Sequence, residues 1–294
     1  MDGTRIIGVT GASGYVGGIV VQALHRSGVQ VRELRRDPES AAAQDGQVAT
    51  FALGDPPAPQ ALAGLDGLVH CAWDFAASSP DAVDRINVLG SLKLLGAAHA
   101  AGVKRLVFIS TMSSFPGCRS LYGKAKLKVE ERARGLGVEI VRPGLVYGSR
   151  AGGMVGALTK VASLPVIPLV GTGSQVLYLV HEDDLGQVVV GFCAGKLTTG
   201  SVPLIAAHPE GWTLKAILWL LAEARGRRPV LVPVPWQCEW LGLRMLELMG
   251  LKLRVRSDSL ISLINQDRSP DFSVGERMGV TFRKFSLDSL GAAH

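Results

Sequence analysis

The sequence predicts an α/β protein, a doubly wound parallel-sheet Rossmann fold with a small discontinuous C-terminal lobe. Three observations support this class. Short apolar runs alternate with amphipathic stretches over the first two-thirds of the chain, the pattern of a parallel sheet covered by helices on both faces. A glycine-rich turn follows the first apolar run directly. The 294 residues are 47% hydrophobic and 19% charged, which allows a large core and excludes a disordered chain.

The elements of the sheet can be assigned in chain order. Strands are predicted at Ile6–Thr10, Val29–Leu34, Ala49–Leu53, Gly67–Ala72, Arg105–Ser110 and Val138–Arg142. Helices are predicted at Val16–Ser27, Asp81–Ala101 and Tyr122–Gly135, and Gly28 and Gly102 follow the first two as helix ends.

After Gly148 the alternation breaks. Ala151–Leu158 and the proline-containing Leu164–Gly173 interrupt it, and Leu185–Ala194 is predicted to be a helix that returns to the sheet. The tail is expected to hold a strand between two apolar helices, at Leu214–Ala224, Val230–Val234 and Trp236–Leu251. It therefore predicts a second, smaller lobe.

The helix predicted at Trp236–Leu251 has two interpretations. It is rich in tryptophan, leucine and methionine, so it could lie on a membrane surface. We favour packing inside the small lobe or along a cleft, because Glu239, Arg244 and Glu247 are mixed in sign and the lysine-rich face of an interfacial helix is missing.

Several classes of protein are disfavoured by composition. The four cysteines (Cys71, Cys118, Cys193 and Cys238) lie far apart, so neither a zinc site nor a disulfide framework is expected, and a cytoplasmic location fits best. We expect no signal peptide and no integral membrane segment, since no apolar run reaches the roughly 18 residues that a span requires. The formal net charge is +6, but the basic residues are not interleaved with aromatic ones, so we expect no nucleic-acid partner.

The glycine-rich turn predicts a dinucleotide site. Gly11 permits the tight turn from strand to helix, Gly14 leaves the backbone open to a phosphate, and Gly17 lets the helix lie close to the strand. A helix N-terminus then presents free N–H groups to pyrophosphate. The candidate contacts with the cofactor along this turn are Gly11, Ser13, Gly14, Tyr15, Val16 and Gly17.

The end of the second strand favours NADP over NAD, although NAD remains open. An acidic residue about 20 positions after the glycines would bind the ribose hydroxyls of NAD. Arg35 and Arg36 stand there instead, and guanidinium groups can bind a 2′-phosphate. From their positions at strand ends, Asp55 is predicted to contact the adenine, and Cys71 and Ala72 to pass along the cofactor.

The chemistry is predicted to lie on Tyr122 and Lys126. The two residues are four apart in a helix, so they share a face, and a nearby ammonium favours the phenolate. Thr111 directly follows the fifth strand, where ligands of such sheets bind, and its hydroxyl could hold a substrate oxygen. Ser110 and Ser113 are its rivals.

These motifs resemble the short-chain dehydrogenases/reductases, in the extended branch with the epimerase/dehydratase-like sequences. The resemblance covers nearly the whole chain and includes TGASGYVG, AGVKRLVFIST, YGKAK and VRPGLVYG. It implies Thr111 as the hydroxyl partner, Tyr122 as acid/base and Lys126 on the nicotinamide ribose. It also implies that Pro143 borders the nicotinamide, and Asn87 is either a supporting residue of the site or a packing residue.

Departures from the branch bear on the reaction. Met112 and Ser113 stand where sugar-nucleotide dehydratases carry Asp-Glu, and Gly144-Leu145 stands where many sugar-nucleotide enzymes have asparagine. The sequence therefore predicts an NADP-dependent oxidoreductase that interconverts a carbonyl and a secondary alcohol on a small, largely apolar molecule. Trp73, Phe75, Met112, Phe115 and Leu145 are the candidate side chains that face this substrate.

Two alternatives stay open: an NAD-dependent sugar-nucleotide epimerase, and a non-catalytic NADP-binding sensor or assembly protein. The predicted division assigns residues 1–148 and 175–207 to the NADP-binding domain, and 149–174 and 208–294 to a substrate-binding lobe. A small-molecule substrate is the expected partner, no metal is expected, and a homodimer is compatible with the sequence.

Overall fold

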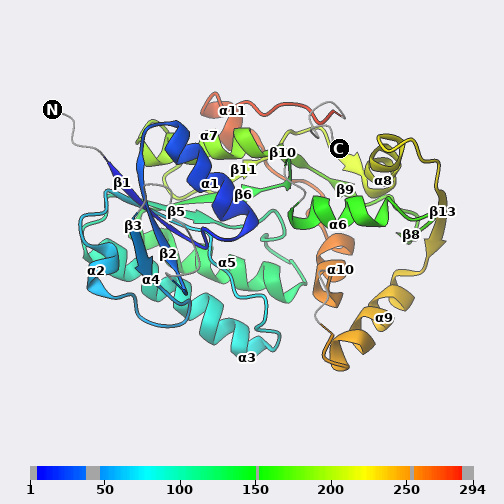
Figure 1. Ribbon diagram of the computed structural model, residues 1–294, viewed down its shortest axis with the longest axis horizontal. Helices are drawn as coiled ribbons and strands as arrows, with labels where there is room; N and C mark the ends of the chain where they lie inside the picture. Colours follow the sequence, from blue (N-terminus) through cyan, green and yellow to red (C-terminus); the bar gives the residue numbers. More distant parts are fainter. Residues whose placement is uncertain (1–4, 38–46, 150–151, 252–254, 287–294) are drawn as a thin grey trace.

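The computed structural model describes residues 5–37, 47–149, 152–251 and 255–286. Its central sheet has seven strands in the order β11-β6-β5-β4-β1-β2-β3, and every neighbouring pair is parallel (Figure 1). The strand order reverses direction between β1 and β4, which is where a doubly wound sheet opens its ligand crevice. The predicted fold class is confirmed.

The strands lie close to their predicted ranges. The sheet consists of β1 (Ile6–Thr10), β2 (Gln30–Arg35), β3 (Gln47–Thr50), β4 (Gly67–His70), β5 (Arg105–Ile109), β6 (Val138–Pro143) and β11 (Leu204–Ala206). β3 starts two residues before the predicted Ala49–Leu53, because it is an exposed edge strand whose first residue, Gln47, is polar and pairs with Arg32. The short strand β11 was not predicted, and it extends the sheet beyond β6.

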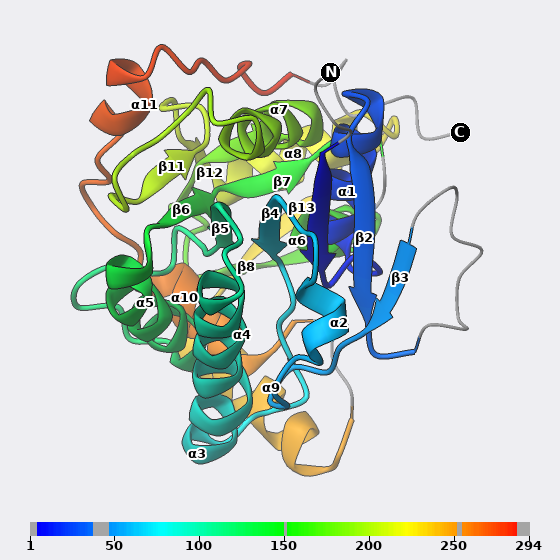
Figure 2. The same ribbon diagram turned by 90° about the vertical axis from the view of Figure 1, so that its left-hand side faces the viewer.

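Helices cover both faces of the sheet (Figure 2). They are α1 (Tyr15–Arg26), α2 (Pro59–Leu62), α3 (Pro80–Ala82), α4 (Leu89–Ala100), α5 (Leu121–Ala133), α7 (Glu182–Cys193) and α11 (Ser273–Arg277). The single helix predicted at Asp81–Ala101 is divided, since a π-helical segment, Val83–Val88, joins α3 to α4.

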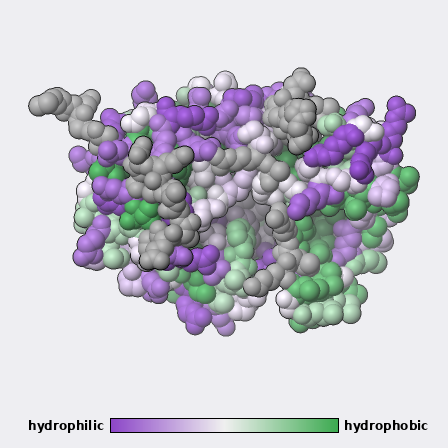
Figure 3. Space-filling model, viewed as in Figure 1, coloured by the Kyte–Doolittle hydropathy of each residue, from purple (hydrophilic) through white to green (hydrophobic). Residues whose placement is uncertain are grey.

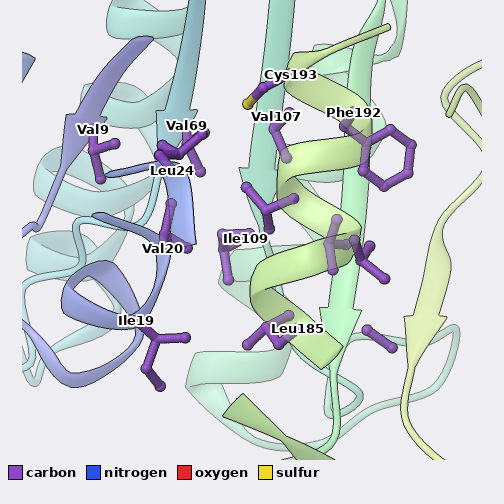
Figure 4. Packing of buried hydrophobic residues seen from close by; sticks show 14 of the residues in the cluster. Val9, Ile19, Val20, Leu24, Val69, Val107, Ile109, Leu185, Phe192 and Cys193 are labelled. Atoms are coloured by element: carbon purple, nitrogen blue, oxygen red, sulfur yellow. The ribbon is translucent and has the colours of Figure 1, made fainter. Parts of the chain in front are cut away.

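Two apolar clusters hold the helices to the sheet. Figure 4 shows the first, in which side chains of α1 and α7, among them Ile19, Val20 and Leu185, pack against Val69 and Val107 of the strands. The second lies on the opposite face beneath α4 and α5. Full burial of one such side chain contributes about 1.5–3 kcal/mol, so these clusters provide the rigid frame that carries the strand ends.

A third apolar cluster lies outside the central sheet. It is built from α6 (Gly153–Val161), α8 (Leu214–Glu223) and three small sheets, and Ile167, Ile217 and Phe285 are among its buried residues. The small sheets pair β7 (Leu145–Tyr147) with β10 (Leu179–His181), β8 (Val166–Val170) with β13 (Val230–Val234), and β9 (Val176–Leu177) with β12 (Trp212–Thr213). The helix expected from Ala151 begins at Gly153, and residues 150–151 lie outside the described part of the chain.

The predicted domain division stays a prediction. The chain between residues 208 and 294 was assigned to the small lobe, but within it Val274 of α11 packs in the first cluster, beside β11 of the large sheet. Residues 1–4 and 287–294, at the ends of the predicted division, lie outside the described residues.

The helix α9 (Trp236–Leu248) corrects one expectation. We predicted that it packs inside the small lobe or along a cleft; none of its residues is buried, so packing inside the lobe is wrong, and the cleft stays a prediction. Leu241, Met245 and Leu248 are 55%, 58% and 73% exposed, and hydrophobic residues gather over α9 at the lower right of Figure 3. The side of α9 that carries Glu247 contacts α10 (Ser257–Ile264). The exposed Leu241, Met245 and Leu248 lie away from this contact and point outward.

Candidate active site

The turn between β1 and α1 has the backbone geometry that its glycines predict. Gly11 adopts a φ of +66°, and a Cβ atom there would lie 2.8 Å from the Cα of Ala72. A Cβ atom on Gly17 would lie only 2.0 Å from the carbonyl oxygen of Gly11. Larger residues would therefore force the turn away from both the helix and the loop after β4.

This turn fits the pyrophosphate of a dinucleotide. Gly14 directly precedes α1, and the first turn of the helix carries no acidic residue, so its positive end is left for an anion. Ser13 beside it is exposed, while the Tyr15 ring packs against the backbone of Gly152 and Gly153. Val16, the last residue of the predicted set, packs partly buried against the first apolar cluster.

A buried polar chain joins β1 to β4, and sequence reasoning missed it. The Thr10 hydroxyl oxygen accepts hydrogen bonds from the backbone N–H groups of Cys71 and Ala72, both at 3.2 Å. Its own proton is then left for Nδ1 of His70 at 2.7 Å, and Nε2 of His70 faces the Ser91 hydroxyl at 2.8 Å.

His70 is neutral in this chain. Burial lowers the pKa of His70 to about 3, with a further contribution from the positive charge of Lys126. With Nδ1 accepting from Thr10, the ring proton lies on Nε2 and is donated to Ser91. This hydrogen-bond network thus fixes the backbone of Cys71 and Ala72, the two residues predicted to pass along the cofactor.

At the end of β2, where the ribose of the cofactor is predicted to bind, the carboxylate of Glu33 lies beside the predicted arginines. Nε of Arg35 donates to Glu33 at 2.6 Å, and the two side chains form a largely buried ion pair. Arg36 is exposed, and so is Asp55, in the loop after β3. The positive charge of Arg35 is therefore balanced within the chain, and Arg36 is the more exposed of the two cations.

Thr111 and Tyr122 contact each other at the end of β5. Desolvation raises the pKa of Tyr122 to about 12, although the neighbouring Thr111 hydroxyl favours the ionised form of the phenol. The ring of Tyr122 lies perpendicular to Trp73 at 5.5 Å and tilted against Phe75 at 5.8 Å. The surrounding groups of the chain thus keep the phenol protonated, and the expected lowering of its pKa stays a prediction that requires the charge of a bound cofactor.

Lys126 is buried at the base of the same helix face. Its Nζ donates to the carbonyl oxygen of Ile109 at 2.7 Å and lies 4.2 Å from the ring centre of Trp73 and 4.5 Å from that of Phe108. Burial lowers the pKa of Lys126 to about 7, although the nearby Glu130 opposes this shift. The distance from Nζ to the ring centre of Tyr122 is 5.9 Å.

Glu130 extends this face by another turn, and sequence reasoning missed it as well. Its fully buried carboxylate accepts from the Ser110 hydroxyl and from Nε and Nη2 of Arg142. The i, i+4, i+8 spacing of Tyr122, Lys126 and Glu130 was the available signal. Ser110, a rival of Thr111 in the sequence, is thereby engaged in a buried ion-pair network that joins α5 to β6.

Asn87 holds the loop after β4. Its Oδ1 accepts from the backbone N–H of Asp74 at 2.7 Å, and its Nδ2 donates to the Asp74 carbonyl at 3.0 Å. The loop so fixed carries Trp73 and Phe75, whose rings contact Tyr122. Asn87 thus supports the site from a buried position.

The remaining predicted residues also lie at the carboxyl ends of the strands. Pro143 ends β6, and its carbonyl oxygen accepts from the N–H of Met112 at 3.3 Å, so it lies next to the segment that carries Thr111. The Cys71 thiol is buried, and burial raises its pKa to about 12. The catalytic and cofactor-binding roles of all these residues stay predictions.

Within ranges 5–37, 47–149, 152–251 and 255–286, no group of three or more His, Cys, Asp or Glu side chains is arranged to hold a metal ion. Among the helices of the described part, none has the length and hydropathy to cross a membrane.

Comparison with known proteins supports the prediction made from the motifs. The model of the NAD dependent epimerase/dehydratase family matches residues 7–195. A ceramide reductase from Caulobacter vibrioides is 31% identical over 240 residues, which cover 80% of this chain and 75% of the reductase. A 4-hydroxy-2-methyl-3-oxo-4-farnesyl-3,4-dihydroquinoline-1-oxide ketoreductase from Stigmatella aurantiaca is 27% identical over 255 residues, covering 78% of this chain and 76% of that enzyme.

Solved structures share the fold. The crystal structure of gox2253 has a TM-score of 0.74 at 22% identity and covers 99% of this chain and 97% of its own. MoeE5, in complex with UDP-glucuronic acid and NAD, has a TM-score of 0.73 at 21% identity, covering 97% and 96%. At identities this low, the likeness shows only that the helices and strands are arranged in the same way.

Proposed function

Because the chain belongs to the NAD dependent epimerase/dehydratase family, within the extended short-chain dehydrogenases/reductases, we propose that it is an NADP-dependent reductase of a ketone on a largely apolar small molecule. The broader class, an NAD(P)-dependent oxidoreductase, follows from the family and from its reductase relatives. The observation that carries the finer proposal is the grouping of the half-buried Thr111 and Tyr122 above the buried Lys126 on one side of α5.

The surroundings of Tyr122 support an apolar substrate. Its ring contacts both Trp73 and Phe75, and Phe75 is 63% exposed, so an aromatic surface is open next to the phenol. Transfer of apolar surface from water to such a site contributes roughly 25 cal/mol per Å². The two reductases named above act, by their names, on a ceramide and on a farnesylated ring system, which favours the same substrate class here.

The proposed mechanism assigns each residue of the cluster one task. A bound nicotinamide dinucleotide supplies the hydride in this chemistry. Tyr122, with a pKa of about 12, is protonated at neutral pH and can donate its proton to the substrate oxygen. The Thr111 hydroxyl orients that oxygen against the phenol, and the Lys126 ammonium stabilises the phenolate that remains.

The glycine turn and the two loops beside it would hold the dinucleotide. The first turn of α1 would offer backbone N–H groups to the pyrophosphate, while Gly11 and Gly14 shape the turn before it, with the Gly14 N–H donated to the Gly11 carbonyl oxygen at 2.9 Å. The Cys71–Ala72 backbone, fixed by Thr10, borders the same turn.

The proposal is tested by NADPH oxidation against a panel of long-chain and cyclic ketones. Tyr122→Phe is expected to lower kcat at least roughly 100-fold, because positioned acid catalysis contributes about 10²–10⁴. Tyr178→Phe is the matched control, since that phenol belongs to a ring pair with Phe272 and is not part of the cluster. Unchanged turnover in Tyr122→Phe would remove the proposed acid, whereas isomerisation of a UDP-sugar with no net redox would point to an epimerase.

Preference for NADP is proposed to depend on Arg36 rather than on Arg35. Arg35 is paired with the buried Glu33, while Arg36 is exposed at the end of β2. A charge-assisted hydrogen bond to phosphate contributes about 1.5–3 kcal/mol. Arg36→Ala should therefore lower kcat/KM for NADPH by about 10- to 100-fold and leave the value for NADH within about threefold. An equal loss with both cofactors would contradict the assignment.

A further inference from the structure

A carboxylate from the C-terminal part of the chain caps the helix that carries Tyr122. Asp258, in the first turn of α10, accepts the backbone N–H of Leu121 at 2.7 Å on one oxygen and that of Tyr122 at 3.0 Å on the other. These are the first two N–H groups of α5, which no residue within a helix can satisfy. The contact joins positions 137 and 136 residues apart in the sequence.

The third N–H of the same first turn of α5 is capped locally instead. The Ser120 hydroxyl accepts the N–H of Gly123 at 3.1 Å. Two cap bonds of α5 therefore come from a distant helix and one from the residue that directly precedes α5, so the two contributions can be separated by experiment.

A second contact from the same part of the chain reaches the aromatic loop beside Tyr122. Nη1 of Arg256 donates to the carbonyl oxygen of Phe75 at 2.6 Å, and the Phe75 ring packs against Tyr122. The start of α10 thus contacts both segments that border the phenol: the first turn of α5 and the loop after β4.

The start of α10 is itself anchored to α9. The Glu247 carboxylate accepts both the N–H and the hydroxyl of Ser257 at 2.8 Å, and it lies 3.7 Å from Nε of Arg256. These bonds lower the pKa of Glu247 despite partial desolvation, so the carboxylate is ionised at neutral pH. The two helices and the Tyr122 turn therefore form one continuous hydrogen-bonded unit.

We propose that Asp258 is a positioning residue for Tyr122: its carboxylate fixes the first turn of α5, and with it the direction of the phenol toward the substrate oxygen. This rests on the proposed function of Tyr122 as proton donor. Two bonds to consecutive N–H groups restrain both the translation and the rotation of that turn, and misplacement by about 1 Å near the reacting atoms can lower a rate by about 100-fold.

The experiment compares Asp258→Ala with Asp258→Asn, which retains one acceptor oxygen, and with Ser259→Ala as a control on the same helix. Asp258→Ala should lower kcat by about 10- to 100-fold while the Kd for NADPH stays within about threefold. Asp258→Asn should recover part of the loss, and Ser259→Ala should match the parent chain. The solvent deuterium isotope effect on kcat should rise in Asp258→Ala, because proton transfer becomes more limiting.

Hydrogen exchange provides a readout that does not depend on activity. In Asp258→Ala, the amides of Leu121 and Tyr122 should both exchange at least about tenfold faster, and in Asp258→Asn only one of the two should do so, while the amide of Gly123 should keep its protection through Ser120. If those amides exchange faster but kcat and the isotope effect are unchanged, Asp258 is structural and the inference fails, while the role of Tyr122 stands. If Tyr122→Phe retains turnover, the proposed function fails instead, whatever the exchange data show.

Discussion

The two ends of the candidate site are built in different ways. At the dinucleotide end, Gly11, Gly14 and Gly17 lie within one turn of chain, and their contacts are mostly with one another and with the adjacent loop. At the Tyr122 end, the supporting groups come from distant parts of the sequence: Asn87 holds the aromatic loop and Asp258 caps the helix.

This difference predicts which of the two ends of the site tolerates substitution better. A backbone turn with no room for a Cβ atom depends on single positions, and no neighbour can replace them. A helix end held by several side-chain hydrogen bonds loses one bond at a time, at about 1–3 kcal/mol each. A single substitution in the glycine turn should therefore abolish the function of that end, whereas single substitutions around Tyr122 should each lower activity only in part.

The largest effect is expected for Gly17→Ala. The new Cβ atom would lie 2.0 Å from the Gly11 carbonyl oxygen, a backbone atom that cannot rotate away, so the turn must open. We expect a loss of at least about 4 kcal/mol in the free energy of unfolding, or no folded protein, and loss of NADPH binding. Gly96→Ala is the matched control: it also lies in a helix, and its Cβ atom would meet nothing within 4 Å.

Urea unfolding followed by circular dichroism measures both variants. The Gly96→Ala chain should be as stable as the parent or more stable by up to about 1 kcal/mol, because alanine is the better helix former. Normal NADPH affinity in Gly17→Ala would show that the turn is not as tightly packed as described.

The next largest effect is expected for Glu130→Gln. The buried carboxylate pairs with Arg142 and accepts from Ser110, so the amide leaves Arg142 without its counter-charge. Removal of one partner of a buried ion pair destabilises by about 3–5 kcal/mol. The substitution also removes the negative charge that opposes the lowered pKa of Lys126, so that pKa should fall further. Thermal unfolding checks the first effect, and a drop of less than about 1 kcal/mol would contradict it.

Sequence patterns predicted the geometry of the glycine turn, but only part of the side chains that surround Tyr122. The glycine spacing and the strand-to-helix context depend on local backbone geometry, so the turn could be placed before the fold was known. The pair Tyr122 and Lys126 could be found from helical periodicity. Asp258 carries no local signal, because its partners are N–H groups more than 130 residues away and any residue type presents such a group.

The structure differs from the sequence-based interpretation in two details, the partner of Arg35 and the exposure of α9. Glu33 was not weighed as the partner of Arg35, because the strand was predicted to end at Leu34, whereas it continues to Arg35 and so places both side chains on one face. The helix α9 was predicted to pack inside the small lobe or along a cleft, and the first of these is wrong, because hydrophobicity alone does not say which surface of a helix is covered.

A smaller effect, of opposite sign, is expected for Lys126→Met. Folding lowers the pKa of Lys126 from its usual 10.5 to about 7, so the charged form is disfavoured in the folded chain. The unfolded chain then binds more protons between pH 7 and 10.5, and the stability of the parent rises with pH across that window.

The penalty at pH 7 is at most about 4 kcal/mol, and loss of the bond to Ile109 and of the two ring contacts offsets part of it. Lys126→Met should therefore be about 1–2 kcal/mol more stable near pH 6, with the difference shrinking toward pH 10, while kcat falls roughly 100-fold. Urea unfolding at pH 6, 8 and 10 tests this. A variant destabilised at every pH would mean that Lys126 is a structural residue.

The smallest effect is expected for Ser120→Ala, and it sharpens the comparison at the level of one helix end. The Ser120 hydroxyl caps Gly123 locally, and removal of such a cap lowers stability by about 1 kcal/mol. Because Asp258 still holds the N–H groups of Leu121 and Tyr122, kcat should stay within about threefold of the parent. Asp258→Ala should give the reverse pattern, with a larger fall in kcat than its loss of stability explains. If the two variants instead change kcat and stability in the same proportion, the distant cap and the local cap are equivalent, and the Tyr122 turn needs no special support from α10.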